Sequence, residues 1–194
     1  MVNGKSSKPV AVVTGANRGL GLETARQLAK RDIRVILTSR SAGKGEIALE
    51  KLADEGLDVA FHPLDVTSES SVADLGGFIH SRYGRVDILV NNAGVYLDSH
   101  GAEEIGGASV FATSLETLTA TLKTNLYGPL LLAQELTPLM KQQHYGRIVN
   151  ISSGMGQLSE MEGKSPAYRI SKTALNALTR ILAAETRDYN ILVN

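Results

Sequence analysis

The chain has 194 residues, 43% of them hydrophobic and 21% charged, which is the composition of a globular domain long enough to bury a core. Twenty basic residues balance twenty acidic ones, which argues against a nucleic-acid partner, and the absence of cysteine excludes disulfides and thiolate chemistry. Four scattered histidines and the lack of a bilayer-length apolar run predict a cytoplasmic protein with no metal site and no membrane partner.

Short runs of β-branched residues alternate along the chain with longer amphipathic segments. The runs are expected to be strands, and they lie at 9–14, 33–38, 58–62, 86–91, 147–152 and 190–194. The segments between them are expected to be helices, and they lie at 19–31, 43–56, 68–83, 114–142 and 166–188. Several strands are continuously apolar, which is typical of strands covered on both faces. The alternation predicts a single α/β domain over residues 1–194, with a doubly wound parallel sheet and helices on both faces.

Two stretches depart from this alternation. Residues 95–113 are rich in glycine and polar side chains, and we expect a surface loop there. The last strand begins at 190 and the chain stops at Asn194, which would leave a short edge strand in a parallel sheet. We therefore expect that the natural protein continues beyond Asn194.

The first strand runs into the sequence TGANRGLG, which places Gly15, Gly19 and Gly21 in the turn before the first helix. Glycine lets the backbone take positive φ and approach a phosphate, and the following helix directs free N–H groups at that phosphate. The spacing G-x-x-x-G-x-G differs from the commoner G-x-G-x-x-G, and three glycines near a turn are a weak signal alone. Their place directly after the first strand favours a dinucleotide site over a merely tight turn.

The end of the second strand bears on the choice between NAD and NADP. A carboxylate there would bind the ribose 2′-OH of NAD, but Ser39 and Arg40 occupy this place. Arg18 lies in the glycine turn itself. Two guanidinium groups suit a 2′-phosphate, which arginine binds through bidentate hydrogen bonds. The alternative is two solvated arginines, and the pattern favours NADP(H) over NAD(H).

Two further strand ends would line the same cleft, because ligands of parallel sheets bind at the carboxyl ends of the strands. Asp65 and Val66 follow the third strand and would contact the adenine. In the NNAG turn after the fourth strand, Asn91 would brace the turn and Gly94 would permit close approach of the cofactor. Each motif has a structural alternative, a loop-capping aspartate or an asparagine-rich turn, which would be favoured if the motif stood alone.

The sequence SPAYRISK combines a helix start with a tyrosine and a lysine four positions apart. Ser165 as N-cap and Pro166 as first helical residue predict that the helix begins there, so Tyr168 would lie in its first turn. Lys172 would lie on the same face one turn further on.

This geometry has a chemical use. A free tyrosine titrates near ~10, too high for easy proton exchange at neutral pH. A nearby ammonium, a helix N-terminus and an oxidised nicotinamide all favour the phenolate, so Tyr168 beside Lys172 suits general acid–base catalysis. The fifth strand ends in VNISSG, which places Ser152 and Ser153 at the mouth of the cleft. Ser153, if it points inward, would donate a hydrogen bond to the substrate oxygen.

Six motifs occur in the order TGANRGLG, LDVT, NNAG, LKTNLYG, VNISSG and YRISK. This order resembles the short-chain dehydrogenase/reductase family over nearly the whole chain, and the long loop after NNAG resembles its carbonyl-reductase-like branch. The resemblance implies a Rossmann-type fold and hydride transfer between NADP(H) and a carbonyl or alcohol. It implies that Tyr168 is the acid/base and Ser153 the carbonyl-orienting donor. Lys172 would bind the nicotinamide ribose and promote the phenolate, and Asn125 would hold a water in a proton relay.

The resemblance also covers the cofactor contacts, which lie in the glycine turn, at the strand ends and in the catalytic helix. They are Gly15, Asn17, Arg18, Gly19, Leu20, Gly21, Arg40, Asp65, Val66, Asn92, Ala93, Gly94, Tyr168 and Lys172. Without the resemblance, Asn125 would be interpreted as a polar residue that kinks a helix beside Gly128 and Pro129. Relatives usually continue past the sixth strand with a substrate-covering loop and a seventh strand.

Alternatives from other functional classes stay open. One is a catalytically silent NADP(H)-binding sensor or interaction protein on the same fold, and another is an epimerase or dehydratase that consumes no NADPH. The expected partner is a small carbonyl or alcohol substrate, and we expect a monomer or a homodimer. Tyr96, Met155, Leu158 and Met161 are expected on the pocket side, which favours an apolar substrate.

Overall fold

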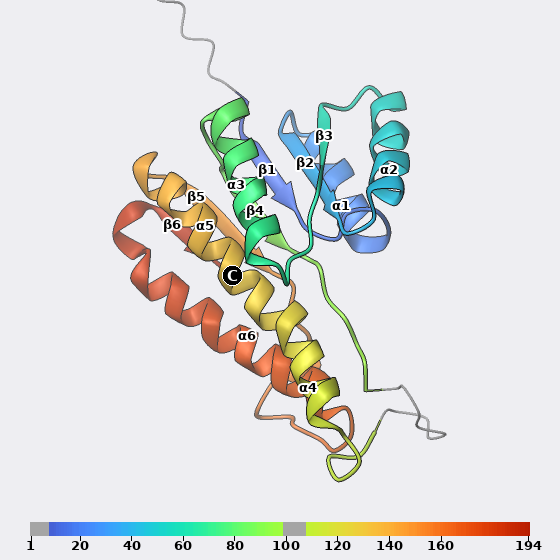
Figure 1. Cartoon of the computed structure of the whole chain (residues 1–194). Helices are drawn as coiled ribbons and strands as arrows, with labels where there is room; N and C mark the ends of the chain where they lie inside the picture. The colour runs from blue at the N-terminus through green and yellow to red at the C-terminus, as the bar shows by residue number, and fades with distance from the viewer. Residues whose placement is uncertain (1–7, 99–107) are drawn as a thin grey trace, which may run out of the picture.

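The computed structural model describes residues 8–98 and 108–194, and its centre is a six-stranded parallel sheet (Figure 1). The strands are β1 (Val10–Val13), β2 (Arg34–Ser39), β3 (Val59–Pro63), β4 (Ile88–Asn91), β5 (Gly146–Asn150) and β6 (Ile191–Val193). Their order in the sheet is β3-β2-β1-β4-β5-β6, and every neighbouring pair is parallel. Strands β2 and β3 are added on one side of β1, and β4, β5 and β6 on the other, so the strand order reverses between β1 and β4. Sheets of this kind bind ligands at that point.

Helices cover both faces of the sheet, which confirms the predicted fold class. The helices are α1 (Gly19–Ala29), α2 (Ala42–Asp54), α3 (Glu69–Tyr83), α4 (Leu115–Leu122), α5 (Gly128–Gln142) and α6 (Pro166–Glu185). Val10 and Val12 of β1 pack into the core beneath α3 and α5, whereas Ala11 and Val13 pack beneath α1 and α2. All four side chains are buried because successive residues of a strand point to opposite faces and both faces are covered.

The segment 114–142, predicted as one helix, contains a π-helical turn, Lys123–Tyr127, between α4 and α5. Pro129 has no N–H to donate to the carbonyl of Asn125, four residues earlier, and its ring crowds that carbonyl. A locally widened turn relieves this conflict without ending the helix. Thr124 of this turn lines a cleft at the carboxyl ends of β1 to β4, and the turn also contains the predicted residue Asn125.

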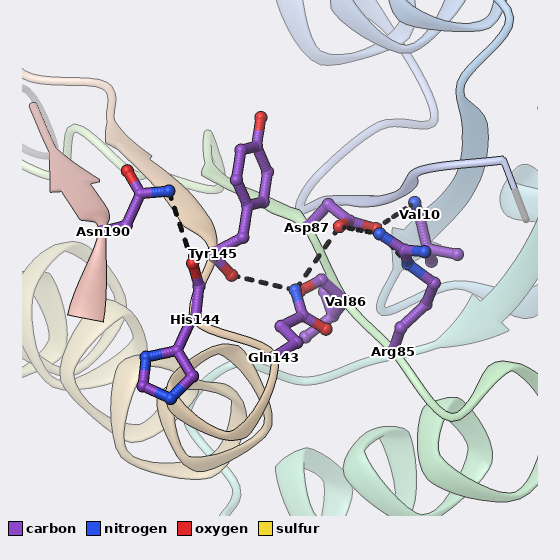
Figure 2. A network of polar contacts seen from close by, with 8 residues as sticks. All are labelled: Val10, Arg85, Val86, Asp87, Gln143, His144, Tyr145 and Asn190. Carbon is purple, nitrogen blue, oxygen red and sulfur yellow. Dashed lines mark hydrogen bonds and ion pairs between the residues drawn. The ribbon is translucent and has the colours of Figure 1, made fainter. Parts of the chain in front are cut away.

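A polar network joins the amino ends of the strands, opposite the ligand end of the sheet (Figure 2). The buried Asp87 carboxylate accepts hydrogen bonds from the Val10 backbone N–H at 2.7 Å and from two nitrogens of Arg85 at 2.9 and 2.6 Å. Gln143, at the end of α5, donates to the carbonyl of Val86 at 2.7 Å. These bonds hold β1 against β4 and against the helix layer, so we infer that the network stabilises the fold.

The remaining segments are short or irregular. Single 3₁₀ turns lie at Gly154–Gly156 and Arg187–Tyr189. The parts of the predicted loop that are described, 95–98 and 108–113, contain no helix or strand, and 99–107 lie outside the described residues. Of the helices in the described ranges, none is long and apolar enough to span a bilayer.

Candidate active site

A cleft of about 480 Å³ opens where β1, β2, β3 and β4 end. It brings together twelve of the predicted cofactor contacts: Gly15, Asn17, Arg18, Gly19, Leu20, Gly21, Arg40, Asp65, Val66, Asn92, Ala93 and Gly94. Ser39, Leu64, Thr67, Val95 and Thr124 also line the cleft. Thr67 and Thr124 belong to the LDVT and LKTNLYG motifs, which is the signal by which they could have been predicted.

The glycines of the first turn have different structural reasons. Gly15 and Gly19 both adopt positive φ, +62° and +59°. A Cβ on Gly15 would lie 3.1 Å from the Cα of Ala93, and one on Gly21 would lie 2.5 Å from Nδ2 of Asn92. A Cβ on Gly19 would meet nothing within 4 Å. Gly15 and Gly21 therefore allow the turn to pack against the NNAG loop, whereas Gly19 borders open space.

Thr14 joins the glycine turn to the NNAG loop, a role that the sequence reasoning missed. Its buried hydroxyl accepts hydrogen bonds from the backbone N–H groups of Asn92 and Ala93 at 3.0 and 2.9 Å. The Asn92 side chain returns a bond to the Thr14 carbonyl at 2.8 Å. Asn91 points elsewhere, because its Nδ2 donates to Oδ1 of Asn150 on β5 at 2.8 Å. Two neighbouring loops thus form one rigid wall of the cleft.

Charged side chains lie at the β2 and β3 end of the cleft. Arg18 and Arg40 are both exposed and line it. The Asp65 carboxylate accepts hydrogen bonds from the backbone N–H and the hydroxyl of Thr67, at 2.9 and 2.8 Å. The backbone bond from Thr67 is the main reason that the pKa of Asp65 lies below its usual range, and the positive charge of Arg40 lowers it further. The carboxylate therefore closes its own turn, which is the loop-capping alternative.

Tyr168 and Lys172 lie together at the start of α6, which begins at Pro166 as predicted. The Lys172 Nζ is 5.6 Å from the centre of the Tyr168 ring and donates a hydrogen bond to the carbonyl of Ile151 at 2.7 Å. A Cβ on Gly94 would lie 3.8 Å from this Nζ, so Lys172 reaches the edge of the cleft. Lys172 is only 5% exposed, and this burial lowers the pKa of its ammonium.

Two serines follow β5, and they make different contacts. The Ser152 hydroxyl donates to Oδ1 of Asn176 on α6 at 2.6 Å, so it is committed to holding α6 and not to the mouth of the cleft. Ser153 is half-buried, and its hydroxyl accepts a hydrogen bond from the Met155 backbone N–H at 3.2 Å. The hydroxyl hydrogen of Ser153 is not used in that bond, because the oxygen is the acceptor.

Asn125 is buried in the π-helical turn and joins two parts of the site. Its Oδ1 accepts from the Val95 N–H and its Nδ2 donates to the Val95 carbonyl, both at 2.8 Å. The same Nδ2 donates to the Ser171 hydroxyl on α6 at 3.0 Å. The side chain therefore holds the loop after β4 against α6. A second lone pair on Oδ1 can accept a hydrogen bond from a water.

Ser165 occupies the N-cap position of α6, as predicted, but its side chain does not cap the helix. Ser165 precedes the helix, but its backbone is left-handed, with φ 52° and ψ 47°, and its side chain makes no capping bond. Its hydroxyl instead contacts the Tyr96 hydroxyl. The Asp98 carboxylate caps the helix, accepting from the N–H groups of Ala167 and Tyr168 at 3.0 and 2.8 Å. No local spacing signals this cap, because Asp98 is 69 and 70 residues away from its partners.

The family model described as short chain dehydrogenase matches residues 9–194, and the chain belongs to this family of oxidoreductases, which bind a nicotinamide cofactor. Among its relatives, the uncharacterized oxidoreductase YxjF of Bacillus subtilis is 40% identical over 96% of this chain and 68% of its own length. The (-)-isopiperitenone reductase of Mentha piperita is 42% identical over 93% of this chain and 81% of its own. Carbonyl reductase [NADPH] 1 of Mus musculus is 40% identical over 76% of this chain and 50% of its own length.

Solved structures show the same fold. A metagenomic short-chain oxidoreductase in complex with NADP superimposes with a TM-score of 0.83 at 32% identity, over 94% of this chain and 78% of that one. An NAD+-bound xylitol dehydrogenase superimposes with a TM-score of 0.86 at 31% identity, over 96% and 68%. Within residues 8–98 and 108–194, no group of three or more histidine, aspartate or glutamate side chains is placed to hold a metal ion.

Proposed function

We propose that the protein is an NADP(H)-dependent oxidoreductase that interconverts a carbonyl compound and its alcohol, with Tyr168 as the general acid/base. The observation that carries this proposal is the placement of Tyr168 beside the buried ammonium of Lys172, which lies next to Gly94 of the cleft. A protein that only bound the cofactor would have no need of a buried charge next to a tyrosine, because that burial is costly.

The cleft fits a dinucleotide phosphate. The absence of side chains at Gly15 and Gly21 keeps the turn close to the N-terminus of α1, whose free N–H groups and dipole favour a phosphate. Arg18 and Arg40 supply positive charge beside the place of the adenosine ribose, and the Asp65 carboxylate is held by Thr67. The neighbours include both an NADP complex and an NAD+ complex, so the preference for NADP(H) rests on the two arginines.

Each of the four predicted catalytic residues would then have its own role in the reaction. When bound, the nicotinamide donates a hydride to the substrate carbon or accepts one from it. In the reducing direction Tyr168 gives its hydroxyl proton to the substrate oxygen, and in the oxidising direction it takes that proton back. Lys172 favours the phenolate through its positive charge, and Ser153 donates a hydrogen bond to the same substrate oxygen. Asn125 holds Val95 and α6 in place and offers its amide oxygen to a water that returns protons from solvent.

The side chains around the start of α6 favour an apolar substrate, although Tyr96, Met155, Leu158 and Met161 are not among the residues that line the cleft. Tyr96 and Met161 are 39% and 40% exposed, and Leu158 is 76% exposed. They belong to the segments that follow β4 and β5, next to the catalytic helix. Contact between such exposed apolar side chains and a hydrocarbon substrate removes apolar surface from water, which makes the free energy of binding more favourable. The relatives include a reductase named for isopiperitenone, which supports a small apolar carbonyl compound.

The test combines a binding measurement with a turnover measurement. NADPH and NADH are titrated by fluorescence, and NADPH absorbance at 340 nm is then followed against a panel of apolar ketones and aldehydes. We expect NADPH to bind at least ~10-fold more tightly than NADH, since one charge-assisted contact contributes about 1.5–3 kcal/mol. We also expect one alcohol per NADPH consumed. Tight binding without consumption would instead support a sensor, and product without net consumption would support an epimerase or dehydratase.

A further inference from the structure

The turn that leads into α6 has an unusual backbone. Lys164 and Ser165 are consecutive non-glycine residues with positive φ, +64° and +52°. L-residues rarely adopt this conformation, and two in succession persist only where surrounding contacts impose them. Such strained turns concentrate at functional sites, and this one ends three residues before Tyr168.

Several contacts at this turn and at the helix start come from the loop after β4, and the Lys164 carbonyl accepts a hydrogen bond from Nε of Arg169 at 3.0 Å. The Asp98 carboxylate, 2% exposed, accepts from the N–H groups of Ala167 and Tyr168. The Asp98 carbonyl accepts from the Ala108 N–H at 3.0 Å, and the Ala108 carbonyl accepts from the Ser165 N–H at 3.0 Å. The Tyr96 hydroxyl contacts the Ser165 hydroxyl, and the Tyr96 ring meets the Tyr168 ring edge to face, with centres 5.1 Å apart.

This cap differs from the other side-chain caps in the described parts of the chain. Helices α2, α3 and α4 are capped by the serine that directly precedes each of them, Ser41, Ser68 and Ser114, through a single bond to a neutral hydroxyl. Helix α6 is capped by a buried carboxylate from a distant segment through two bonds. A helix that needed only a cap would not require a buried charge, because burying a charge carries a desolvation penalty that a serine avoids.

We propose that Asp98 is a positioning residue for Tyr168. By holding the N–H of Tyr168 itself, it fixes where the first turn of α6 places the phenol, and Tyr96 fixes the plane of the ring from the same segment. The loop after β4 would thereby set the distance between the phenol oxygen and the substrate oxygen. This inference rests on the proposed function, in which Tyr168 transfers the proton.

The test compares Asp98→Ala and Asp98→Asn with the wild-type protein. Alanine removes both bonds, whereas asparagine keeps one acceptor oxygen. A displacement of about 1 Å in a catalytic group costs on the order of 100-fold in rate, so we expect kcat to fall 10- to 100-fold in Asp98→Ala and less in Asp98→Asn. NADPH fluorescence titration gives the number of competent binding sites, so kcat is expressed per cofactor-binding molecule. The Kd for NADPH is expected to stay within twofold of wild type.

The matched control is Ser114→Ala, which removes a helix cap of α4 outside the cleft and outside the contacts of Tyr168. It is expected to lower the Tm and to keep the wild-type kcat. If Asp98→Asn and every soluble form of Asp98→Ala keep the wild-type kcat per NADPH site, Asp98 is only a structural cap and the proposal is wrong. Should Asp98→Ala fail to fold, a wild-type kcat in Asp98→Asn still refutes it. A wild-type protein that never consumes NADPH would refute the proposed function itself.

Discussion

Replacing Gly21 by alanine tests the packing of the glycine turn most sharply. A Cβ at this position would lie 2.5 Å from Nδ2 of Asn92 and 2.6 Å from the carbonyl oxygen of Gly15. Ordinary contact begins at 3.4 Å, so Asn92 would have to move by about 0.9 Å, and the Gly15 carbonyl is backbone that cannot rotate aside. The bond from Asn92 to the Thr14 carbonyl, now 2.8 Å, would lengthen or break.

The magnitude follows from three contributions. Overpacking of this kind costs about 1–3 kcal/mol, and the weakened Asn92 bond costs about 1 kcal/mol more. Alanine is a better helix former than glycine and returns up to about 1 kcal/mol, because Gly21 lies in the first turn of α1. We expect a net loss of about 2 kcal/mol and a fall in Tm of about 4–8 °C. We also expect a Kd for NADPH at least ~10-fold higher, because the turn that we propose to bind the phosphate is displaced.

Thermal unfolding and NADPH fluorescence titration measure the two effects. Gly19→Ala is the matched control in the same turn, because its Cβ would meet nothing within 4 Å, although its φ of +59° still costs about 1–2 kcal/mol. It is expected to lower the Tm by less than Gly21→Ala does. A Gly21→Ala protein with wild-type Tm and wild-type affinity for NADPH would refute the reasoning about close packing in this turn.

Three further predictions concern charge. Arg40→Ala is expected to raise the Kd for NADPH about 10-fold and to leave the Kd for NADH unchanged. An equal loss of affinity for both cofactors would contradict a 2′-phosphate contact, and so would the same effect from Arg187→Ala, which replaces an exposed arginine. Lys172→Met is expected to lower kcat at least ~100-fold. Burial lowers the pKa of Lys172, so between that lowered pKa and 10.5 the unfolded chain binds more protons than the folded protein. The Tm of the wild type minus that of Lys172→Met is therefore expected to rise with pH in this window. A difference in Tm that does not change with pH would contradict this expectation. Asp87→Asn is expected to cost ~3 kcal/mol and about 6–12 °C in Tm, because it removes a buried carboxylate that accepts from the Val10 N–H and from Arg85, and kcat per folded molecule is expected to stay unchanged. A wild-type Tm would contradict the stabilising role of the network in Figure 2.

The sequence was sufficient to predict the order of strands and helices, because burial on both faces makes strands such as β1 continuously apolar. It also placed the glycine turn and the start of α6 correctly, since Pro166 marks a first helical turn by its fixed φ. These features are local, and local rules describe them.

Features that depend on distant residues were missed. The cap of α6 comes from Asp98, and the role of Thr14 depends on Asn92, which follows a different strand. Ser165 has the right residue type for a cap but a left-handed backbone, which the loop contacts impose and residue type does not reveal. The π-helical turn at Lys123–Tyr127 arises from a proline conflict inside a sequence that is otherwise regularly helical.

The central claim is that Tyr168 transfers the proton, and the kcat of Tyr168→Phe at saturating NADPH tests it most directly. The substitution removes one hydroxyl and keeps the ring that contacts Tyr96. We predict that kcat falls by about 10²–10⁴-fold while the Kd for NADPH changes by less than ~10-fold, since at most one hydrogen bond to the cofactor is lost. A Tyr168→Phe protein that reduces the carbonyl substrate as fast as wild type would contradict the account.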